Sequence, residues 1–349
     1  MTSKTFSEIH DQYKALARTL ALAEEKRAAC KAFFDRQDPD RVIVVGCGSS
    51  YQLSQAIAAS IGIHLRKAAF AIPGGDLMLH PGQYAPLFEG RPMLFLISRS
   101  GSTSEVLYAL RHLKGQYPAL SVFCIAATEG SEIAALSDYV MEIPWAFDES
   151  VCQTRSVTNL YAAAMLAVAS AADEDEVFES YRCLAEGGED YLASFEEQIR
   201  EIGEGDFASA AVLADGEGAP VADEAALAFN EIAYTPSTFK HVLDVRHGPI
   251  VLFDKKTVVL VKAEAEGLSY QKDLVADLLG NDSDVIIISD EELPPFEGVR
   301  AQICFGKKLH PMATMAVVLP VAQLMAYYHA VAIQVNPDAP SGLDAWIKL

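Results

Sequence analysis

The stretch RVIVVGCGSSYQLSQAIAASIG, residues 41–62, decides the fold. Its apolar run over residues 42–45 has the length of a buried strand, and a glycine- and serine-rich loop leads from it into a helical pattern over residues 53–62. The same order returns with a strand over residues 93–97, a second glycine- and serine-rich loop and a helix from Glu105. This alternation predicts βαβ units, and therefore a parallel sheet flanked by helices.

The pattern extends in both directions from this stretch. Apolar residues at steps of three and four over residues 6–35 predict an amphipathic helix before the first strand. Further strands are expected over residues 122–126, 210–214, 258–261, 285–289 and 303–305, and further helices over residues 222–233 and 312–333. The second half of the chain thus repeats the architecture of the first. We expect an α/β protein with two tandem three-layer αβα domains, each with a mainly parallel sheet, after an N-terminal helix.

An acidic segment separates the two halves. Residues 173–204 hold twelve acids and two arginines, with Gly187 and Gly188 between helical stretches, which indicates a solvated helical connector. The predicted parts are the helix of residues 1–35, a first domain with the connector over residues 36–195, and a second domain with the C-terminal helix and tail over residues 196–349.

Composition excludes several classes of protein. The net charge of −21 and the lack of a dense Lys/Arg cluster argue against binding to nucleic acid. Glycine, proline or charge interrupts the longest apolar stretches before the roughly 20 residues of a membrane helix, and the N-terminus has no apolar secretion core. We therefore expect a cytoplasmic protein with no membrane partner. Six cysteines without C-x-x-C spacing indicate free thiols rather than disulfides or a zinc site.

The first glycine- and serine-rich loop, residues 46–50 (GCGSS), is a candidate ligand site. An acidic protein must bind a phosphate locally, through backbone N–H groups, hydroxyls and a helix N-terminus. A glycine turn before a helix lets a ligand approach those amides. The alternative is a tight turn between strand and helix with no ligand, and G-x-G alone is weak support for a site.

The second loop, residues 98–103 (SRSGST), supplies four hydroxyls and one guanidinium. Short neutral hydroxyl donors can surround a phosphate monoester, and Arg99 adds a charged contact if it turns inward. The alternative is that these hydroxyls only cap the helix. Two such loops at the carboxyl ends of strands of one parallel sheet favour ligand binding, because open α/β sheets bind ligands there.

Together the two loops resemble the SIS (sugar isomerase) domain. Residues 224–254, EAALAFNEIAYTPSTFKHVLDVRHGPIVLFD, strengthen the match. They are similar to a segment of the isomerase half of glucosamine-6-phosphate synthase, which has a glutamate on a helix and an H-G-P turn sixteen residues later. Glu231 and His247 have this separation. The resemblance covers roughly residues 40–340, including the Asn-Pro-Asp turn at residues 336–338.

The resemblance implies a set of ligand-binding residues. Arg99 stands where the synthase has glutamine, and Cys47 falls at a small loop position that suggests packing rather than nucleophilic attack. Residues 150–156 are similar to the family loop that covers the sugar and begins a helix, and capping of that helix is the alternative role of Thr154. The implied contacts to phosphate or sugar come from Gly48, Ser49, Ser50, Ser98, Arg99, Ser100, Thr103, Gln153, Thr154 and Lys348.

The resemblance also implies two catalytic residues. Glu231 is the expected base that moves a proton between C1 and C2, and His247 is the expected group that opens the sugar ring. In the family this histidine reaches the partner subunit's site, which implies a homodimer with shared active sites. The alternatives are a solvated helical glutamate and a histidine that only holds its turn. Proton transfer needs neither metal nor cofactor, and we expect none.

Two departures argue against the synthase reaction. The family lysine one turn before the glutamate falls at Ala228, and the tail lysine falls at Ala345, with Lys348 nearby. Thr2 stands where a glutaminase nucleophile would be needed. The chain is more similar to stand-alone tagatose-6-phosphate ketose/aldose isomerases, aminosugar-phosphate deaminases and fructosamine-phosphate deglycases. We expect an intramolecular oxidoreductase-type isomerase of a hexose or aminohexose 6-phosphate; the alternatives are a deaminating or deglycating enzyme and a phosphosugar-binding regulator without turnover.

Overall fold

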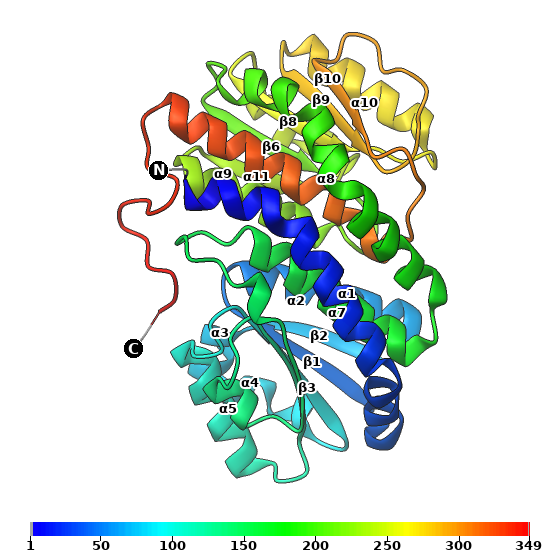
Figure 1. Ribbon diagram of the computed structural model, residues 1–349, viewed down its shortest axis with the longest axis vertical. Helices are drawn as coiled ribbons and strands as arrows, with labels where there is room; N and C mark the ends of the chain where they lie inside the picture. Colours follow the sequence, from blue (N-terminus) through cyan, green and yellow to red (C-terminus); the bar gives the residue numbers. More distant parts are fainter. Residues whose placement is uncertain (1–2, 348) are drawn as a thin grey trace. The chain divides into compact units, whose positions relative to one another are not determined.

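Parallel sheets flanked by helices form the fold of the computed structural model, which describes residues 3–347 and 349 (Figure 1). The first sheet has the order β2 (Ala68–Pro73), β1 (Arg41–Gly46), β3 (Pro92–Ser98), β4 (Ser121–Ala126), β5 (Tyr139–Glu142). The second has the order β10 (Ala301–Cys304), β9 (Asp284–Ser289), β8 (Thr257–Lys262), β6 (Ser209–Leu213), β7 (Ser237–Lys240). The predicted α/β fold with two repeated halves is confirmed. Thr2 and Lys348 lie outside the described residues.

Helices connect the strands and cover the sheets. They are α1 (Lys4–Gln37), α2 (Ser49–Ser60), α3 (Gly74–Leu79), α4 (Pro81–Tyr84), α5 (Ser104–Gln116), α6 (Glu132–Ala135), α7 (Arg155–Ala172), α8 (Asp175–Gly203), α9 (Pro220–Ala233), α10 (Leu268–Gly280) and α11 (Met315–Ala332). The expected N-terminal helix is therefore present. The sequence pattern did not reveal β2, β5 and β7, which are short or partly exposed strands, nor α10.

The chain groups into two compact units. The β1–β5 unit comprises residues 14–149 and 155–182 and the C-terminal residues from Asp344. The β6–β10 unit comprises the N-terminal residues up to Tyr13, residues 150–154 and residues 183–343. Both α1 and α8 contribute residues to each unit. The domain boundaries expected from the sequence stay a prediction.

Alternate residues of the strands face opposite layers in each unit. In the β1–β5 unit, Ile43, Leu94 and Val122 pack with Leu110 of α5, while Phe123 packs with aromatic rings of α1. In the β6–β10 unit the strand residues of one face pack with α10, and α9 and α11 contact the sheet as well. The strands β1, β3, β4, β6, β8 and β9 are buried on both faces, which explains why their sequences read as continuous apolar runs.

The acidic connector is one continuous, packed helix, so the expected break at its glycines is wrong. A Cβ on Gly188 would lie 2.2 Å from the ring of Tyr13, so glycine makes room for that ring rather than ending α8. Buried Tyr181, Leu184 and Tyr191 line the inner side of α8. The acids occupy the other side, and the segment is amphipathic rather than fully solvated.

Tyr13, whose ring lies beside Gly188, also stabilises the long apolar helix α11. Residues Pro311–Ala332 are long and apolar enough to cross a membrane by length and composition, but 78% of their most apolar window is buried inside the fold, as in a core helix. The expectation that glycine, proline or charge interrupts the longest apolar stretches is wrong for this helix, because α11, which lies within the helix expected over residues 312–333, continues through Pro320. Proline leaves the carbonyl of Ala316 without its helical donor, and the Tyr13 hydroxyl donates to that oxygen at 3.0 Å.

In each sheet, the third strand along the chain is added on the opposite side of the first strand from the second. The chain runs from β1 outward to β2 and then returns to the other side of β1 to form β3, so the reversal lies between β1 and β3. The second sheet reverses in the same way between β6 and β8. Open α/β sheets bind ligands in the crevice outside the strand ends at such a reversal. The loops after β1, β3, β6 and β8 are therefore the candidate ligand-binding loops of this fold.

Candidate functional site

The first loop follows β1 at the reversal point. Gly48 has a φ of 54°, a left-handed conformation that favours glycine, and α2 begins at the next residue. A Cβ on Gly46 would lie 2.5 Å from the backbone of Ser50, so only glycine lets the helix begin this close to the strand. Ser49 and Ser50 are buried, and the amide of Ser50 donates to the carbonyl of Cys47 at 3.1 Å.

The second loop follows β3, the direct neighbour of β1. Ser98, Arg99 and Ser100 are all buried. The Ser98 hydroxyl accepts from the amide of Gly101 at 2.9 Å, and the Ser100 hydroxyl lies 3.5 Å from that of Thr103. These bonds fold the loop into a compact turn in which the hydroxyls share one short segment.

Helix capping does not account for Thr103. It occupies the N-cap position of α5, but its hydroxyl makes no side-chain cap bond to the helix. The Ser100 hydroxyl instead accepts from the amide of Ser102 at 3.3 Å. A hydroxyl that is not used for capping is available to a ligand at this helix start, where N–H groups and the helix dipole favour an anion. The roles of these hydroxyls in binding stay a prediction.

Arg99 points toward the C-terminal tail of its own unit. Its guanidinium donates to the carbonyl of Ala345, and the amide of Ser104 donates to the carbonyl of Ile347 at 3.4 Å. The tail therefore runs along the second loop and the start of α5. The predicted contact from Lys348 lies outside the described residues.

Cys47 behaves as a packed thiol. Burial raises its pKa to about 11, and the nearby Glu105 carboxylate acts in the same direction. A Cβ on Gly74 would lie 2.7 Å from its sulfur, so the thiol fills the space that this glycine leaves. A thiol that stays protonated at neutral pH is a poor nucleophile, in agreement with a packing role.

The equivalent loops of the β6–β10 unit carry acids in place of hydroxyls. Asp215 and Glu217 follow β6, and Glu264 and Glu266 follow β8. The side chain of His241 bonds Asp215 at 2.9 Å. Carboxylates repel a phosphate, so the chemistry of these loops suits phosphate less well than that of the loops after β1 and β3.

The two predicted catalytic residues lie in the β6–β10 unit. Glu231 is half-buried in the last turn of α9. His247 is exposed at the end of a short 3₁₀ helix, Asp244–His247. The following Gly248 has a φ of 136°, which requires glycine at this turn. The structure places both residues without testing their roles, which stay predictions.

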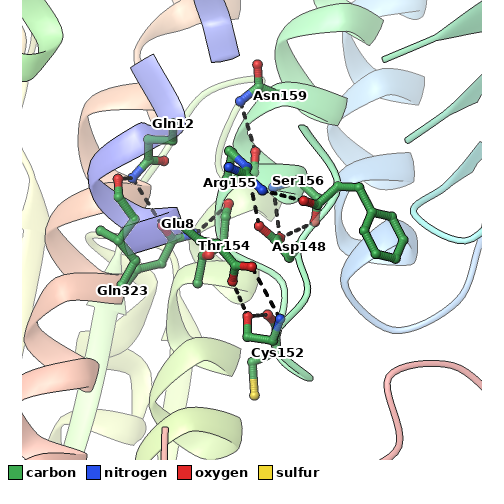
Figure 2. A network of polar contacts seen from close by, with 12 residues as sticks. Glu8, Gln12, Asp148, Cys152, Thr154, Arg155, Ser156, Asn159 and Gln323 are labelled. Atoms are coloured by element: carbon green, nitrogen blue, oxygen red, sulfur yellow. Dashed lines mark hydrogen bonds and ion pairs between the residues drawn. The ribbon is translucent and has the colours of Figure 1, made fainter. Parts of the chain in front are cut away.

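Gln153 and Thr154 belong to a short segment of the same unit, residues 150–154. Thr154 is fully buried, and its carbonyl accepts from the side-chain amide of Gln323 at 3.3 Å. Figure 2 shows this segment beside Glu8 of α1, whose carboxylate accepts from the amide of Ser150 at 3.3 Å and from its hydroxyl. Glu8 could not be singled out from the sequence, because one acid in an amphipathic helix is typical of a surface residue.

A second buried acid holds the start of α7 in the β1–β5 unit. Asp148 accepts from the amide of Ser156 at 2.9 Å and from its hydroxyl at 2.5 Å (Figure 2). The first of these bonds satisfies the amide of Ser156 in the first turn of α7. Within residues 3–347 and 349, no group of three or more His, Cys, Asp or Glu side chains is arranged to hold a metal ion.

The loops after β1 and β3 lie in a stretch that matches a known domain. Residues 37–170 match the sequence model of the SIS domain. The chain contains a SIS domain. The fold of the whole chain, with its two five-stranded parallel sheets, is also similar to that of solved structures.

Relatives of the SIS protein include sugar-phosphate enzymes. The isomerising glutamine–fructose-6-phosphate aminotransferase of Caulobacter vibrioides is 26% identical over 358 residues, and the match covers 96% of the SIS protein. It spans only 57% of the aminotransferase. Glucosamine-6-phosphate deaminase from Thermotoga maritima has a similar structure, with a TM-score of 0.82 and 26% identity over 99% of the SIS protein and 100% of the deaminase chain.

A third relative shares the fold at lower identity. The tagatose-6-phosphate ketose/aldose isomerase from Escherichia coli has a TM-score of 0.85 and 23% identity over 98% of the SIS protein and 96% of that chain. The family resemblance inferred from the loops and from residues 224–254 is thus confirmed. The three relatives are named as an isomerising aminotransferase, a deaminase and an isomerase of sugar phosphates.

Proposed function

We propose that the SIS protein is a cytoplasmic phosphosugar isomerase that acts on a hexose or aminohexose 6-phosphate. The observation that carries the proposal is the pair of hydroxyl-bearing loops after the adjacent strands β1 and β3, at the reversal point of the sheet. The net charge of −21 means that a phosphate dianion must be bound by local donors. The hydroxyls of these loops and the N-termini of α2 and α5 are donors of this kind. The names of the relatives support a phosphosugar as the ligand.

In the proposed reaction the sugar phosphate is bound by Ser50, Ser98, Ser100 and Thr103. Glu231 takes the proton from C1 of the open-chain ketose, which leaves an enediolate, and returns it to C2, while a proton moves between the two oxygens. The product is the aldose. This step oxidises C1 and reduces C2 with no external oxidant, so it requires no redox cofactor.

The same proton transfer accommodates release of an amine. When C2 of an aldose carries an amino group, transfer of the C2 proton to C1 and of a proton from the nitrogen to the C1 oxygen gives an imine at C2. Addition of water and loss of ammonia then give the ketose. One proposed base, Glu231, would suit both reactions, so an assay on several substrates must decide between isomerase and deaminase, with a fructosamine 6-phosphate added to include deglycation.

We assign ring opening to His247, acting in a homodimer. A side chain able to exchange protons near neutral pH suits this task. His247 is exposed, and three apolar side chains around it are exposed as well: Leu243 at 40%, Val251 at 80% and Leu252 at 75%. Exposed apolar side chains gathered beside a functional residue favour burial against another surface, and a second copy of the chain is the proposed one.

An assay of the purified protein with fructose 6-phosphate, tagatose 6-phosphate, glucosamine 6-phosphate and a fructosamine 6-phosphate tests the proposal. Interconversion of sugars and release of ammonia or amine are followed together, because each identifies one branch. Binding without turnover of any of these sugars would support a phosphosugar-binding regulator instead. Absence of both binding and turnover would contradict the phosphosugar proposal itself.

A further inference from the structure

The strand β2 forms one edge of the first sheet and is the longest edge strand that the structure describes. It has six residues, whereas β5, β7 and β10 have four each. Its sequence, AAFAIP, has no polar or charged side chain, whereas the other three edge strands carry Glu142, Lys240 and Gln302. Proteins usually shield an edge strand by short length or by charge, and β2 has neither protection.

The outer edge of β2 is open to pairing. The strand pairs with β1 in a parallel register that runs from Ala68 opposite Arg41 to Pro73 opposite Gly46. No hydrogen bond from a described residue outside β1 reaches the backbone of residues 68–72. The proline is the last residue of the strand, so it leaves the rest of the edge able to pair.

Exposed apolar side chains lie on β2 and on the elements beside it. Phe70, in the middle of the strand, is 41% exposed. Ile63 of the π-helix η1 (Ile61–Leu65) and Leu79 of α3 are more exposed still, and both of these elements contact β2. Single exposed apolar side chains are common, but a group of them around an open strand edge indicates a binding surface.

The charges at the two ends of β2 are complementary. Arg66, two residues before the strand, is exposed and forms no ion pair with a described residue. Asp76, three residues after the strand, keeps a partly exposed carboxylate that accepts from the Tyr84 hydroxyl and lies 3.9 Å from His80. A strand that is positive at one end and negative at the other complements an antiparallel copy of itself, because unlike charges then meet at both ends.

We propose that β2 is an interface with a second copy of this chain, in which the two β2 strands pair antiparallel across a two-fold axis at Ala71. In this register Phe70 of one copy lies opposite Ile72 of the other. Arg66 of one copy lies at the end of the paired strands where Asp76 of the other is found. Such an interface is self-complementary, so each of these contacts is made twice.

The β2 interface is separate from the surface around His247. The strand belongs to the β1–β5 unit, whereas His247 belongs to the β6–β10 unit. Each surface can join two copies by itself, so a protein that uses both forms an assembly larger than a dimer. The β2 interface does not depend on the proposed function, because neither phosphosugar binding nor turnover enters the argument for it.

Disulfide cross-linking tests the register. Residues directly opposite each other in an antiparallel pair have Cα atoms about 4.5–5.5 Å apart, within the range of about 4.4–6.8 Å that a disulfide spans. Ala71→Cys should therefore give a disulfide-linked dimer on a non-reducing gel after mild oxidation. The control is Ala68→Cys in the same strand, because two copies of this residue lie about 20 Å apart in the proposed register. The wild type measures the background from the native cysteines.

The mass of the assembly tests the interface without oxidation. Phe70→Lys places a charge at the centre of the paired strands and should halve the mass measured by sedimentation, while the Tm stays unchanged because Phe70 is exposed. Tyr108→Lys, on an exposed position of α5, is the control and should keep the wild-type mass. Arg66→Glu places an acid against Asp76 and should weaken association less than Phe70→Lys. It serves as the test variant if Phe70→Lys does not fold.

Three results would overturn the proposal. Ala71→Cys that cross-links no more than the wild type would contradict the antiparallel pairing. Equal cross-linking of Ala71→Cys and Ala68→Cys would show random collision rather than a fixed register. An unchanged mass in a folded Phe70→Lys variant would show that β2 joins no second copy.

Discussion

Replacing Gly46 by alanine should displace the start of α2 and with it the first phosphate-binding loop. The added Cβ would lie 2.5 Å from the backbone carbon and from the carbonyl oxygen of Ser50. Non-bonded carbon atoms rest about 3.5 Å apart or farther, so the helix start must move by roughly 1 Å. No side-chain rotation relieves this contact, because the atoms that the Cβ meets include the backbone.

The size of the effect follows from this geometry. Overpacking costs about 1–3 kcal/mol, and a clash with backbone belongs at the upper end, so we expect about 3 kcal/mol. At about 2–4 °C per kcal/mol for a unit of this size, the Tm should fall by about 6–12 °C. Gly82→Ala is the control, since its Cβ would meet no atom within 4 Å and its φ is not left-handed, and its effect should stay within about 0.5 kcal/mol.

Thermal unfolding and calorimetric titration measure the two consequences. At a temperature where Gly46→Ala is folded, its affinity for fructose 6-phosphate should be at least about tenfold weaker, because a binding loop displaced by 1 Å no longer matches its neighbour. A Gly46→Ala protein with wild-type Tm and wild-type affinity would refute the reasoning that this glycine sets the distance between strand, loop and helix.

Three further changes probe single side chains. Arg99→Gln removes the donor to Ala345 and should speed hydrogen exchange of the tail from Asp344 about tenfold; unchanged exchange would contradict a role of Arg99 in holding the tail. Burial works to raise the pKa of Asp338, but bonds from Ser3 and two amides outweigh it and hold the pKa below its usual value. The stabilisation by the Asp338 carboxylate is therefore complete above about pH 4 and is lost as the pH falls further. In urea unfolding, the free energy of unfolding should therefore fall less on acidification in Asp338→Asn than in the wild type. Cys47→Ala should keep turnover within about threefold, since burial keeps the thiol protonated; complete loss in a folded variant would make Cys47 a reacting group.

The central strands of both sheets were predictable from the sequence, whereas the core helix α10 was not. The buried runs of β1, β3, β4, β8 and β9 are continuous and apolar, and the glycine loops mark where helices begin. By contrast, β2 has exposed and half-buried residues with Ile72 as its one buried side chain, and all four residues of β7 are half-buried. Such strands owe their conformation to a neighbour in the sheet rather than to their own pattern.

The features that could not be predicted depend on contacts between residues that lie far apart in the chain. The sequence at Gly188 predicts a helix break, but glycine is needed there to make room for the ring of Tyr13. The hydroxyl of Tyr13 in turn donates to the helix carbonyl that Pro320 leaves without a donor. No local pattern connects three residues so far apart in the chain. The same holds for Glu8, whose acceptor role depends on Ser150 lying beside it in the fold.

The candidate site, too, was predictable only where its residues lie close together in the sequence. Both hydroxyl-bearing loops were predictable, because each is one short segment after a strong strand signal. Their placement side by side depends on the strand order, which a sequence suggests only through family resemblance. The engagement of Arg99 by the tail carbonyl of Ala345 was not predictable, since a backbone acceptor carries no sequence signature.

The most direct test of the central claim compares wild type with Glu231→Gln on the panel of hexose, aminohexose and fructosamine 6-phosphates. We predict turnover of at least one substrate by the wild type. In the variant the loss of the base should reduce kcat by about 10²-fold or more, while the affinity for the same sugar phosphate stays within about threefold. Wild-type binding without turnover, or a variant that turns over as fast as wild type, would contradict the account of Glu231 as the base of a phosphosugar isomerase.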